Sequence, residues 1–435
     1  MTANLLRWNV ALQSGSGARL RVMLAASAAM LAATQPAHAE ALALRPIIDA
    51  RLRYEGVDQA GPAKDADAVT MRIRSGVEAS GAALSVLVEA EGTLALSERY
   101  NSGVNGKAAY PIVADPETIE LNRIQLQYKG LPKTVLTVGR QRINLDDQRF
   151  VGSVAWRQNE QTFDAARVEW TGVKGLKADV TYAWSQRTIW GVDGFGARQQ
   201  AVRGDTILAN LSYRLKTGTI TGFAYVVDQD EAAITYLGQP FSLSSQTYGA
   251  RAAFALPLSK AVKLTLLASY ARQADHHRSR IDYGADYWLG EAGLSAKGWT
   301  LTGGYEVLGA DAGACNRMTG RPVVASVQTP LATLHKFNGW ADKFLTTPPN
   351  GLRDAYGSIG YTLPRVGRMG PLGLLVAYHR FDSDRLGIDY GSEWNAQATL
   401  KISKRLSALA KYADYQADAF ATDTRKYWFQ LDYAL

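Results

Sequence analysis

The chain has 435 residues, of which 10% are aromatic and 20% charged, and it contains one cysteine, Cys315. A lone cysteine excludes a fold held by internal disulfides, and the length allows either two or three soluble domains or one large β-structure. The formal charge of +8 falls to +5 once Arg7, Arg19 and Arg21 of the N-terminal segment are set aside. This mild excess is compatible with an anion-handling surface and gives no basis for nucleic-acid binding.

The first segment, Met1 to Ala39, has the layout of a secretory signal peptide. Two arginines precede a mostly apolar run from Val22 to Ala33, and Ala37-His38-Ala39 supplies small residues around a cleavage point. The run is short for a bilayer span, so an uncleaved anchor helix is the less favoured alternative. We predict cleavage after Ala39, which leaves residues 40–435 as one exported domain. No later run reaches the ~18 apolar residues that a membrane-spanning helix needs.

The exported part is dominated by alternation of apolar and polar residues in segments of about ten residues. In VTMRIRS, from Val69 to Ser75, apolar residues alternate with Thr and Arg, and in ILANLSYRL, from Ile207 to Leu215, only Leu208 interrupts the polar face. A strand with one oily and one polar face is typical of a barrel in lipid, and we count about eighteen. They begin near Pro46, Ala68, Ala83, Thr118, Thr134, Thr162, Leu176, Asp205, Gly218, Ser245, Val262, Tyr287, Trp299, Ala355, Gly370, Gly391, Leu406 and Arg425.

Short and long connections alternate between these segments. Short ones such as Gly172 to Gly175 are rich in turn residues, whereas the longest, Asp311 to Asp354, has no alternating strands of its own. We therefore predict an all-β fold, a transmembrane antiparallel β-barrel of about 18 strands with short periplasmic turns and long extracellular loops. The Asp311 to Asp354 loop either folds into the pore as a gate or lies on the surface. The alternative fold is a soluble sandwich or propeller, whose strands are usually shorter.

Aromatic residues near the ends of the predicted strands favour the membrane interpretation, because a ring with a polar tip suits the lipid–water interface. The β-propensity of Tyr and Trp is the alternative explanation. The predicted interfacial residues are Tyr54, Tyr128, Trp170, Tyr213, Tyr225, Tyr270, Trp288, Trp299, Tyr361, Tyr378, Tyr427 and Tyr433.

If the apolar faces contact lipid, the polar faces line a lumen that is wide enough for water. Charges of both signs occur there, so pairing between neighbouring strands that only stabilises the wall is the competing explanation. The predicted lining is Asp49, Arg51, Arg53, Glu55, Arg72, Arg74, Glu78, Glu89, Glu91, Arg123, Arg167, Glu169, Asp179, Arg187, Arg214, Arg251, Glu291, Glu306, Glu393, Lys401, Lys411 and Lys426.

The stretch GRQRINLDDQRFVGSVAWRQNEQTFDA, from Gly139 to Ala165, adds four arginines, and with Arg167 these are nearly balanced by the five acids Asp146, Asp147, Glu160, Asp164 and Glu169. We interpret it as a strand end, an extracellular loop and the next strand start, with its arginines at a pore entrance. Arg presents a planar fork of donors to carboxylates and phosphates, so a ring of arginines favours anions. The predicted pore-lining residues are Arg72, Arg74, Arg123, Arg140, Arg142, Arg149, Arg157, Arg167, Arg187, Arg214 and Arg251.

The residues from Val138 to Trp170 resemble a characteristic region of the alginate-export family of outer-membrane porins, and FNGWADKFLTTPPNG, from Phe337 to Gly351, is also similar to members of it. This resemblance implies an eighteen-stranded monomeric barrel in the bacterial outer membrane, with an electropositive pore for anionic polysaccharide, oligosaccharide or acidic sugar. The residues that carry it most clearly are Gly139, Arg140, Gln141, Arg149, Trp156, Thr162, Phe163 and Asp164.

Two other functions remain open. A general porin for small solutes would need the same barrel. An outer-membrane hydrolase would need a nucleophile with a base in reach, and no Ser-His pair is recognisable around His276, His277, His335 or His379. Asn144 with Asp146 and Asp147 resembles only a fragment of a loop for a hard cation, so we expect no metal and no cofactor. The partners expected are the solute and outer-membrane lipid; a periplasmic partner and the direction of transport stay open.

Overall fold

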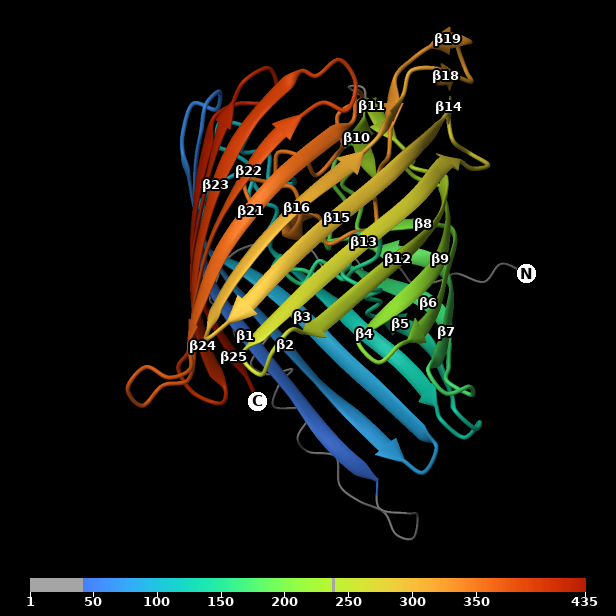
Figure 1. Ribbon diagram of the computed structural model, residues 1–435, viewed down its shortest axis with the longest axis vertical. Coiled ribbons are helices and arrows are strands. Elements are labelled where there is room, and N and C mark those ends of the chain that lie inside the picture. Colours follow the sequence, from blue (N-terminus) through green and yellow to red (C-terminus); the bar gives the residue numbers. More distant parts are fainter. Residues whose placement is uncertain (1–41, 237–238) are drawn as a thin grey trace, which may run out of the picture.

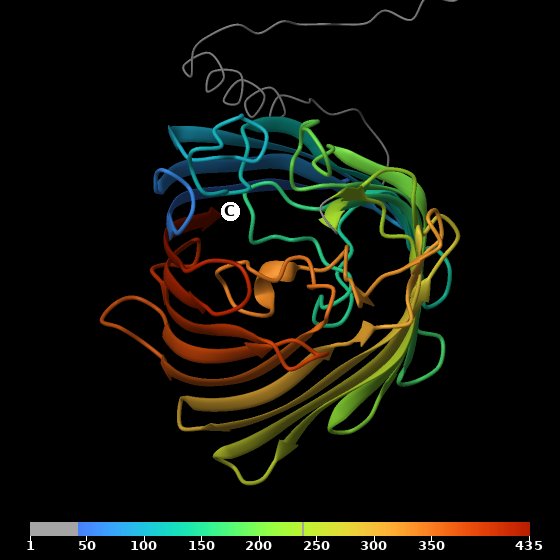
Figure 2. The same cartoon turned by 90° about the horizontal axis from the view of Figure 1, so that it is seen from above.

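The computed structural model describes residues 42–236 and 239–435, so the predicted signal peptide lies outside the described residues. Eighteen antiparallel strands form one closed sheet, in which β1 pairs with both β2 and β25 (Figures 1 and 2). The predicted starts of the strands are confirmed to within four residues. The strands are β1 (Ala43–Gln59), β2 (Ala66–Gly81), β3 (Leu84–Arg99), β4 (Thr118–Tyr128), β5 (Thr134–Gln141), β6 (Thr162–Trp170), β7 (Leu176–Arg187), β8 (Ala201–Arg214), β9 (Gly218–Gln229), β12 (Ser245–Pro257), β13 (Val262–Asp275), β15 (Gly284–Ala296), β16 (Trp299–Leu308), β21 (Leu352–Leu363), β22 (Leu372–Asp382), β23 (Asp389–Lys401), β24 (Leu406–Ala417) and β25 (Thr424–Ala434).

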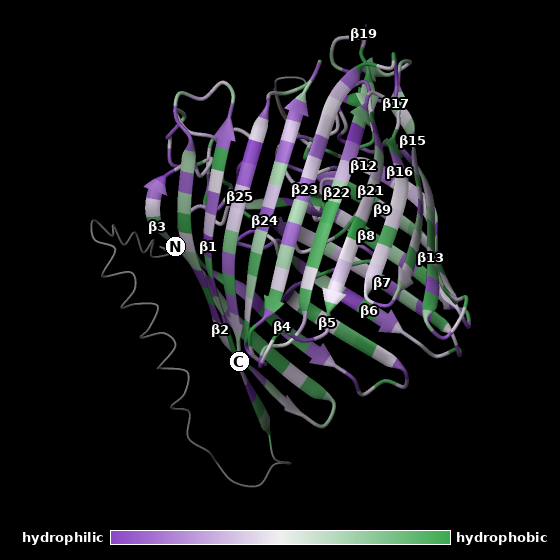
Figure 3. Ribbon diagram, turned by 60° about the vertical axis from the view of Figure 1, so that its left-hand side comes forward, coloured by the Kyte–Doolittle hydropathy of each residue, from purple (hydrophilic) through white to green (hydrophobic). Residues whose placement is uncertain are grey.

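Most strands have an outward apolar face and an inward polar face, as the alternation predicted, although β8, β9 and β15 also turn Leu208, Phe223 and Tyr287 inward. On β2 the inward Arg72 is buried, and on the neighbouring β1 the outward Leu52 is 42% exposed. Figure 3 shows the change between apolar and polar residues along the strands. Exposed Leu, Val and Ile cover the outer surface of most strands. This inside-out distribution is stable only where hydrocarbon replaces water around the barrel. Among the described residues no helix is long and apolar enough to cross a membrane.

Outward aromatic residues lie toward both ends of the barrel. Tyr128, Tyr213 and Trp299 are near the short turns, and Tyr270 and Trp288 are near the long loops, all of them more than a third exposed. The prediction is wrong for Tyr225, which is 4% exposed and faces inward, where its hydroxyl donates to Asn210 at 2.8 Å. We predicted an interfacial position for Tyr225 because it lies near a strand end. Whether a side chain faces lipid or the interior, however, is decided by the alternation along the strand.

The two ends of the barrel differ. We name them the turn end, which carries the short connections, and the loop end, which carries the long ones. The loop end also holds small elements: β10 (Ile234–Tyr236) pairs with β11 (Gln239–Phe241), β18 (Cys315–Asn316) pairs with β14 (Ile281–Asp282) and β19 (Arg321–Pro322), and β17 (Ala310–Asp311) pairs with β20 (Ala325–Ser326). The Asp311 to Asp354 segment therefore does contain short strands, too short to show alternation in the sequence.

Two long connections fold into the barrel, which Figure 2 shows as the teal and orange segments that cross the interior. The first inward loop is residues 142–161, and the second is residues 327–351, which includes the short 3-10 helix η1 (Leu334–Lys336). The backbone N–H of Gly152 donates to the Leu331 carbonyl at 2.8 Å, and that of Thr333 donates to the Gln148 carbonyl at 3.1 Å. Because they share these hydrogen bonds, the two loops form one unit.

Candidate functional site: the lumen and its inward loops

The inward face of β1 and β2 carries a column of arginines close to the two loops. In the β1–β2 register Arg51 stands directly opposite Arg72. Arg51 Nε donates to Asp432 Oδ1 at 2.7 Å, and Arg72 pairs with Asp49. Arg72 is only 1% exposed, and its Nε and Nη1 atoms have no hydrogen-bond partner among the described residues. The two arginines thus lie on neighbouring strands. Arg51 has Asp432 of β25 on its other side, whereas Arg72 pairs with Asp49 of β1, two residues from Arg51.

A second cluster, of three arginines and three glutamates, lies next along the wall. Arg74 on β2 pairs with Glu91 and approaches Glu160 of the first inward loop at 3.3 Å. Arg123 on β4 contacts Glu89 at 2.6 Å, while Arg142 pairs with Glu160 and contacts Glu89 at 3.2 Å. Every charge in this cluster has an opposite partner. These pairs bind the first inward loop to the wall. They agree with the alternative that the inward charges stabilise the barrel by pairing with each other.

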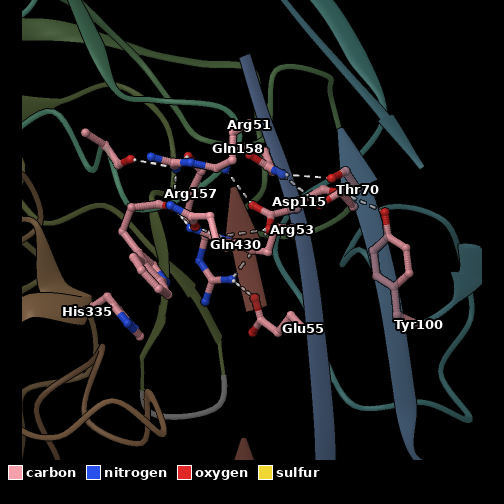
Figure 4. A network of polar contacts seen from close by, with 12 residues as sticks. Arg51, Arg53, Glu55, Thr70, Tyr100, Asp115, Arg157, Gln158, His335 and Gln430 are labelled. Atoms are coloured by element: carbon pink, nitrogen blue, oxygen red, sulfur yellow. Dashed lines mark hydrogen bonds and ion pairs between the residues drawn. The ribbon is translucent and has the colours of Figure 1, made fainter. Parts of the chain in front are cut away.

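The motif residue Trp156 contacts Arg53 of the wall and His335 of the second inward loop, and Figure 4 shows the polar network around Arg53 and His335. The guanidinium of Arg53 lies 4.0 Å from its ring centroid and donates to its carbonyl at 2.6 Å. On the same ring, His335 of the second inward loop stacks at 4.4 Å with an interplanar angle of 5°. The indole therefore joins the barrel wall to both loops, which gives a physical reason for this residue in the motif.

Asp342 of the second inward loop gathers three cationic or imidazole groups. It accepts from Arg157 Nη2 at 2.8 Å, from Lys426 Nζ on β25 at 2.8 Å and from His335 Nδ1 at 2.6 Å. Burial opposes its negative charge, but His335, Lys426 and Arg157 together hold the pKa of Asp342 well below its usual range. The carboxylate therefore stays ionised and joins both loops to the wall.

His335 also accepts a hydrogen bond from Lys411 on β24, whose Nζ lies 2.8 Å from His335 Nε2. The Lys411 ammonium faces the rings of Trp340 at 3.7 Å and Trp156 at 4.2 Å. Since Nε2 accepts and Nδ1 donates to Asp342, the imidazole is in its neutral form with the proton on Nδ1. Burial, with the nearby Lys411 and Arg157 charges, lowers the pKa of His335 well below its usual value despite Asp342.

Arg149, predicted to line the pore, is buried where the first inward loop meets β16. Its guanidinium donates to Glu306 at 2.6 Å, to Thr329 at 3.0 Å and to Asn338 at 3.3 Å. Burial disfavours its charge, yet Glu306 and Tyr287 raise the pKa of Arg149 above its ordinary value. Arg149 and Arg157, 2% and 5% exposed, hold the loops in place instead of facing an open entrance.

Arg140 is not a pore-lining residue, which corrects the prediction. It shares the outward face of β5 with Val138, which is 51% exposed, and pairs across the strands with Ile124 and Asp164. Its Nε donates to Asp164 at 2.7 Å on the outside of the barrel. Because Arg140 lies two residues after Val138, the alternation of the strand already placed it on the outward face. The many charges around it drew attention away from this pattern.

The other predicted arginines lie on the interior side. Arg167 contacts Asp179 at 2.6 Å, Arg187 contacts Glu120 at 3.5 Å, and Arg251 contacts Asp147 at 3.2 Å. Arg214 is exposed at the turn end of β8. These positions keep their pore-lining role as a prediction.

Two further motif residues explain the geometry of β5. Gly139 has φ 114°, and a Cβ there would lie 2.3 Å from the Ile124 carbonyl oxygen, so only glycine fits. Gln141 is buried and its side-chain amide donates to the Ala165 carbonyl at 3.0 Å. Phe163 is buried in the interior core, whereas Asp164 faces outward with Arg140.

The interior wall of β8, β9, β12, β13, β15 and β16 differs from the charged one. Its inward Phe223, Tyr225 and Tyr287 pack around Phe150 of the first inward loop, with ring centroids 5.1 to 5.9 Å from that of Phe150. Leu208, which interrupts the polar alternation of β8, belongs to this buried core. The apolar interruption therefore marks where an inward loop packs.

Sequence reasoning missed Asp115, Asp342 and Trp340, each of which comes from a loop. Asp115 accepts from the backbone N–H of Gln158 at 2.8 Å and lies 3.7 Å from Arg53 (Figure 4). Loops carry no alternation from which an inward position could be inferred. The nearest signal was the family resemblance over Phe337 to Gly351, which includes Trp340 and Asp342.

The acidic residues considered as a cation loop have other partners. Asn144 accepts from the Ser153 N–H at 2.7 Å, Asp146 accepts from Asn210 at 2.8 Å, and Asp147 pairs with Arg251. Within residues 42–236 and 239–435 no group of three or more His, Cys, Asp or Glu is arranged to hold a metal ion.

Comparison with known proteins agrees with this architecture. A family model described as alginate export matches residues 48–241. Comparison with curated protein sequences gives no match. Among solved structures, OccK9 (OpdG) of Pseudomonas aeruginosa is similar with 14% identity, 90% of this chain and 98% of that chain covered, and a TM-score of 0.67. OccAB1 of Acinetobacter baumannii has 13% identity, 90% and 96% coverage, and a TM-score of 0.68.

The fold match and the family match together support an outer-membrane channel. The resemblance inferred from Val138 to Trp170 is confirmed, since this stretch lies inside the matched region. The chain is an eighteen-stranded β-barrel of the outer-membrane porin fold whose residues 48–241 match the alginate export family.

Proposed function

We propose that the barrel is a passive channel for anionic saccharides or small acidic solutes. The observation that carries this proposal is the Arg51–Arg72 pair on the lumenal face of β1 and β2. Like charges directly opposite on neighbouring strands repel each other. An anion in the lumen beside Arg51, whose side chain is 13% exposed, would relieve that repulsion. The buried Arg72, whose Nε and Nη1 have no hydrogen-bond partner in the part of the chain that the structure describes, would add its charge without direct contact.

Arginine favours carboxylate and phosphate over other anions. Arg51 Nε and Nη1 already donate to Asp432 and to the Trp156 carbonyl, which leaves its Nη2 for the anion. Acidic sugars carry such a carboxylate, and the alginate export match supports a saccharide. The cluster around Glu89, Glu91 and Glu160 is neutral, so selectivity would come from the Arg51–Arg72 site and not from the charge of the whole interior.

The test is a planar-bilayer recording of the reversal potential under a KCl gradient. We expect the wild-type channel to prefer Cl⁻, and the Arg51→Gln/Arg72→Gln double variant to lose most of that preference. Lys401→Gln, at an exposed lumenal position of the turn end, is the matched control for a lost lumenal charge and should change it little. A cation-selective wild-type channel, or equal losses in both variants, would contradict the proposal.

A general porin is the second candidate, and the paired charges of the interior favour it. Arg74, Arg123 and Arg142 are neutralised, so a neutral solute meets no strong field there. Liposome swelling distinguishes the two: a general porin admits neutral and acidic sugars of equal size at equal rates, whereas the proposed channel admits the acidic sugar faster.

We also propose that the mature protein begins after Ala39, is a monomer and has no enzymatic activity. N-terminal sequencing of the protein purified from outer membranes tests the cleavage point. Mass measurement in detergent tests the monomer, and an ester-hydrolysis assay on the pure protein tests the absence of activity.

A further inference from the structure

The eight short connections at the turn end, opposite to β18 and β19 in Figure 1, carry positive charge only. Their sequences contain ten Lys or Arg and no Asp or Glu. The long connections at the loop end, by contrast, contain somewhat more Asp and Glu than Lys and Arg. The positive excess of the chain is therefore concentrated at one end of the barrel. The ten residues are Lys129, Lys133, Lys174, Lys216, Lys260, Lys297, Arg365, Arg368, Lys404 and Arg405.

These ten cations have no acidic partner within the barrel. All ten are exposed, and none forms an ion pair with a carboxylate within residues 42–236 and 239–435. The ion pairs of this end, Arg45–Glu78 and Lys177–Glu169, join strand residues instead. The loop end differs, because Arg317 of a long connection pairs with Asp275. The turn end thus keeps the charge of its connections available for a partner.

The positive charge lies past the end of the lipid-facing wall. Outward strand positions nearest the turn end are apolar or aromatic, among them Tyr128, Tyr213 and Trp299, and none of those that the structure describes is Lys or Arg. The ten cations lie in the connections beyond these rings. The exposed strand-end cations Arg214 and Lys401 alternate with outward residues and so face the mouth of the barrel. The charge is therefore directed at the mouth and the space beneath it, and not sideways into the bilayer.

We propose that the turn end binds the cell-wall polymer beneath the outer membrane through the carboxylates of its peptide stems. Such a polymer is an extended network that repeats its carboxylates in all directions. Seven of the eight turns contribute a cation, so the charges surround the mouth of the closed barrel as a ring. Each exposed contact is weak on its own, but a ring of them can engage a repeating polyanion at many points at once. The predicted orientation, with the turns periplasmic, places this ring on the side of the wall.

The experiment is co-sedimentation of the purified full-length barrel, in detergent, with isolated cell-wall sacculi that have been freed of bound proteins. The bound fraction over a range of sacculus concentrations gives an apparent Kd. We expect Arg365→Gln/Arg368→Gln/Lys404→Gln/Arg405→Gln to weaken binding roughly tenfold, since four exposed charge contacts on two neighbouring turns are lost. Sacculi whose carboxylates have been amidated are the comparison ligand, and the wild-type barrel should bind them weakly.

The matched control is Lys64→Gln/Arg99→Gln/Arg280→Gln/Arg321→Gln. It also removes three arginines and one lysine from exposed positions, but at the loop end, and it should bind as the wild type does. All the substituted side chains are exposed, so both variants should fold, which heat-dependent migration on a gel verifies.

Equal binding by the turn-end variant and the wild type would overturn the proposal. So would equal affinity for native and amidated sacculi. If the barrel binds vesicles of anionic phospholipid and does not bind sacculi, the charge serves the bilayer and the assignment to the wall is wrong. Orientation is checked with Lys260→Cys in a Cys315→Ser background. We expect an impermeant maleimide to label it only in permeabilised cells, and labelling of intact cells would contradict the proposal.

Discussion

The two lumenal walls hold the same pair of inward loops by different kinds of interaction. On the wall formed by β25 and β1 to β4, buried ion pairs converge on Asp342, Glu89 and Glu160. On the wall from β8 to β16, aromatic rings pack on Phe150, and Arg149 and Arg251 supply ion pairs. The first wall holds the loops mainly by ion pairs, whereas on the second wall aromatic packing on Phe150 adds to the Arg149–Glu306 and Arg251–Asp147 pairs. The same two loops are therefore held by ion pairs on one side and largely by aromatic packing on the other.

The largest expected effect comes from Asp342→Ala. Removing this carboxylate leaves Arg157 and Lys426 buried with only partial compensation, and breaking a buried charge pair costs about 3–5 kcal/mol. We expect the free energy of opening of the inward loops to fall by that amount. Hydrogen exchange at the Gly152 and Thr333 amides measures it, and the single-channel current should rise. Unchanged amide protection would show that the charged wall does not hold the loops.

Phe150→Ala tests the apolar wall in the same assay. Phe150 is partly buried against Phe223, Tyr225 and Tyr287, so we expect a loss of about 2–4 kcal/mol in the opening free energy. Phe150→Leu is the control, because it keeps most of the volume and should cost less. If both variants exchange like the wild type, the aromatic packing is incidental.

Acid should loosen the loops by a smaller amount. The pKa of His335 is lowered in the docked state, so that state binds fewer protons than the open one. Its contribution is present above about pH 6.5 and decreases below it, by at most about 1.4 kcal/mol per pH unit. Asp342 stays ionised throughout, and Lys343, whose pKa burial lowers to about 8, is protonated in both states below pH 7.

Amide exchange between pH 7 and pH 5, corrected for the intrinsic rate, measures this slope. His335→Gln should remove it, because glutamine can donate to Asp342 and does not titrate. The other charged groups around the ring are Arg53, Arg157, Lys411 and Lys426. A slope that persists in the variant would assign the acid effect to another group.

The smallest effect is expected for Arg140→Gln, on the outer face. Its pair with Asp164 is partly exposed, so the loss in stability should stay below about 1 kcal/mol. Ion selectivity should not change, because the side chain lies outside the lumen. The reversal potential measured beside Arg51→Gln/Arg72→Gln checks this, and a shift of similar size would return Arg140 to the pore.

Much of the barrel could be predicted because membrane strands repeat one rule. Arg72 and Met71 take opposite faces as period-2 alternation requires, and the starts of all eighteen strands followed from it. The predictions for Tyr225 and Arg140 were wrong because they did not use this alternation. It had nothing to say about Asp115 and Asp342, since loops have no fixed periodicity.

The sequence by itself determined the closed sheet, the faces of its strands and the alternation of turns and loops, because hydrocarbon outside and water inside impose a local pattern on every strand. Only the tertiary structure decided where the arginines act. Arg149 and Arg157 are far in sequence from Glu306 and Asp342, and only the closed barrel brings these side chains together. The sequence shows which residues are charged, but only the folded chain shows which opposite charge each of them contacts.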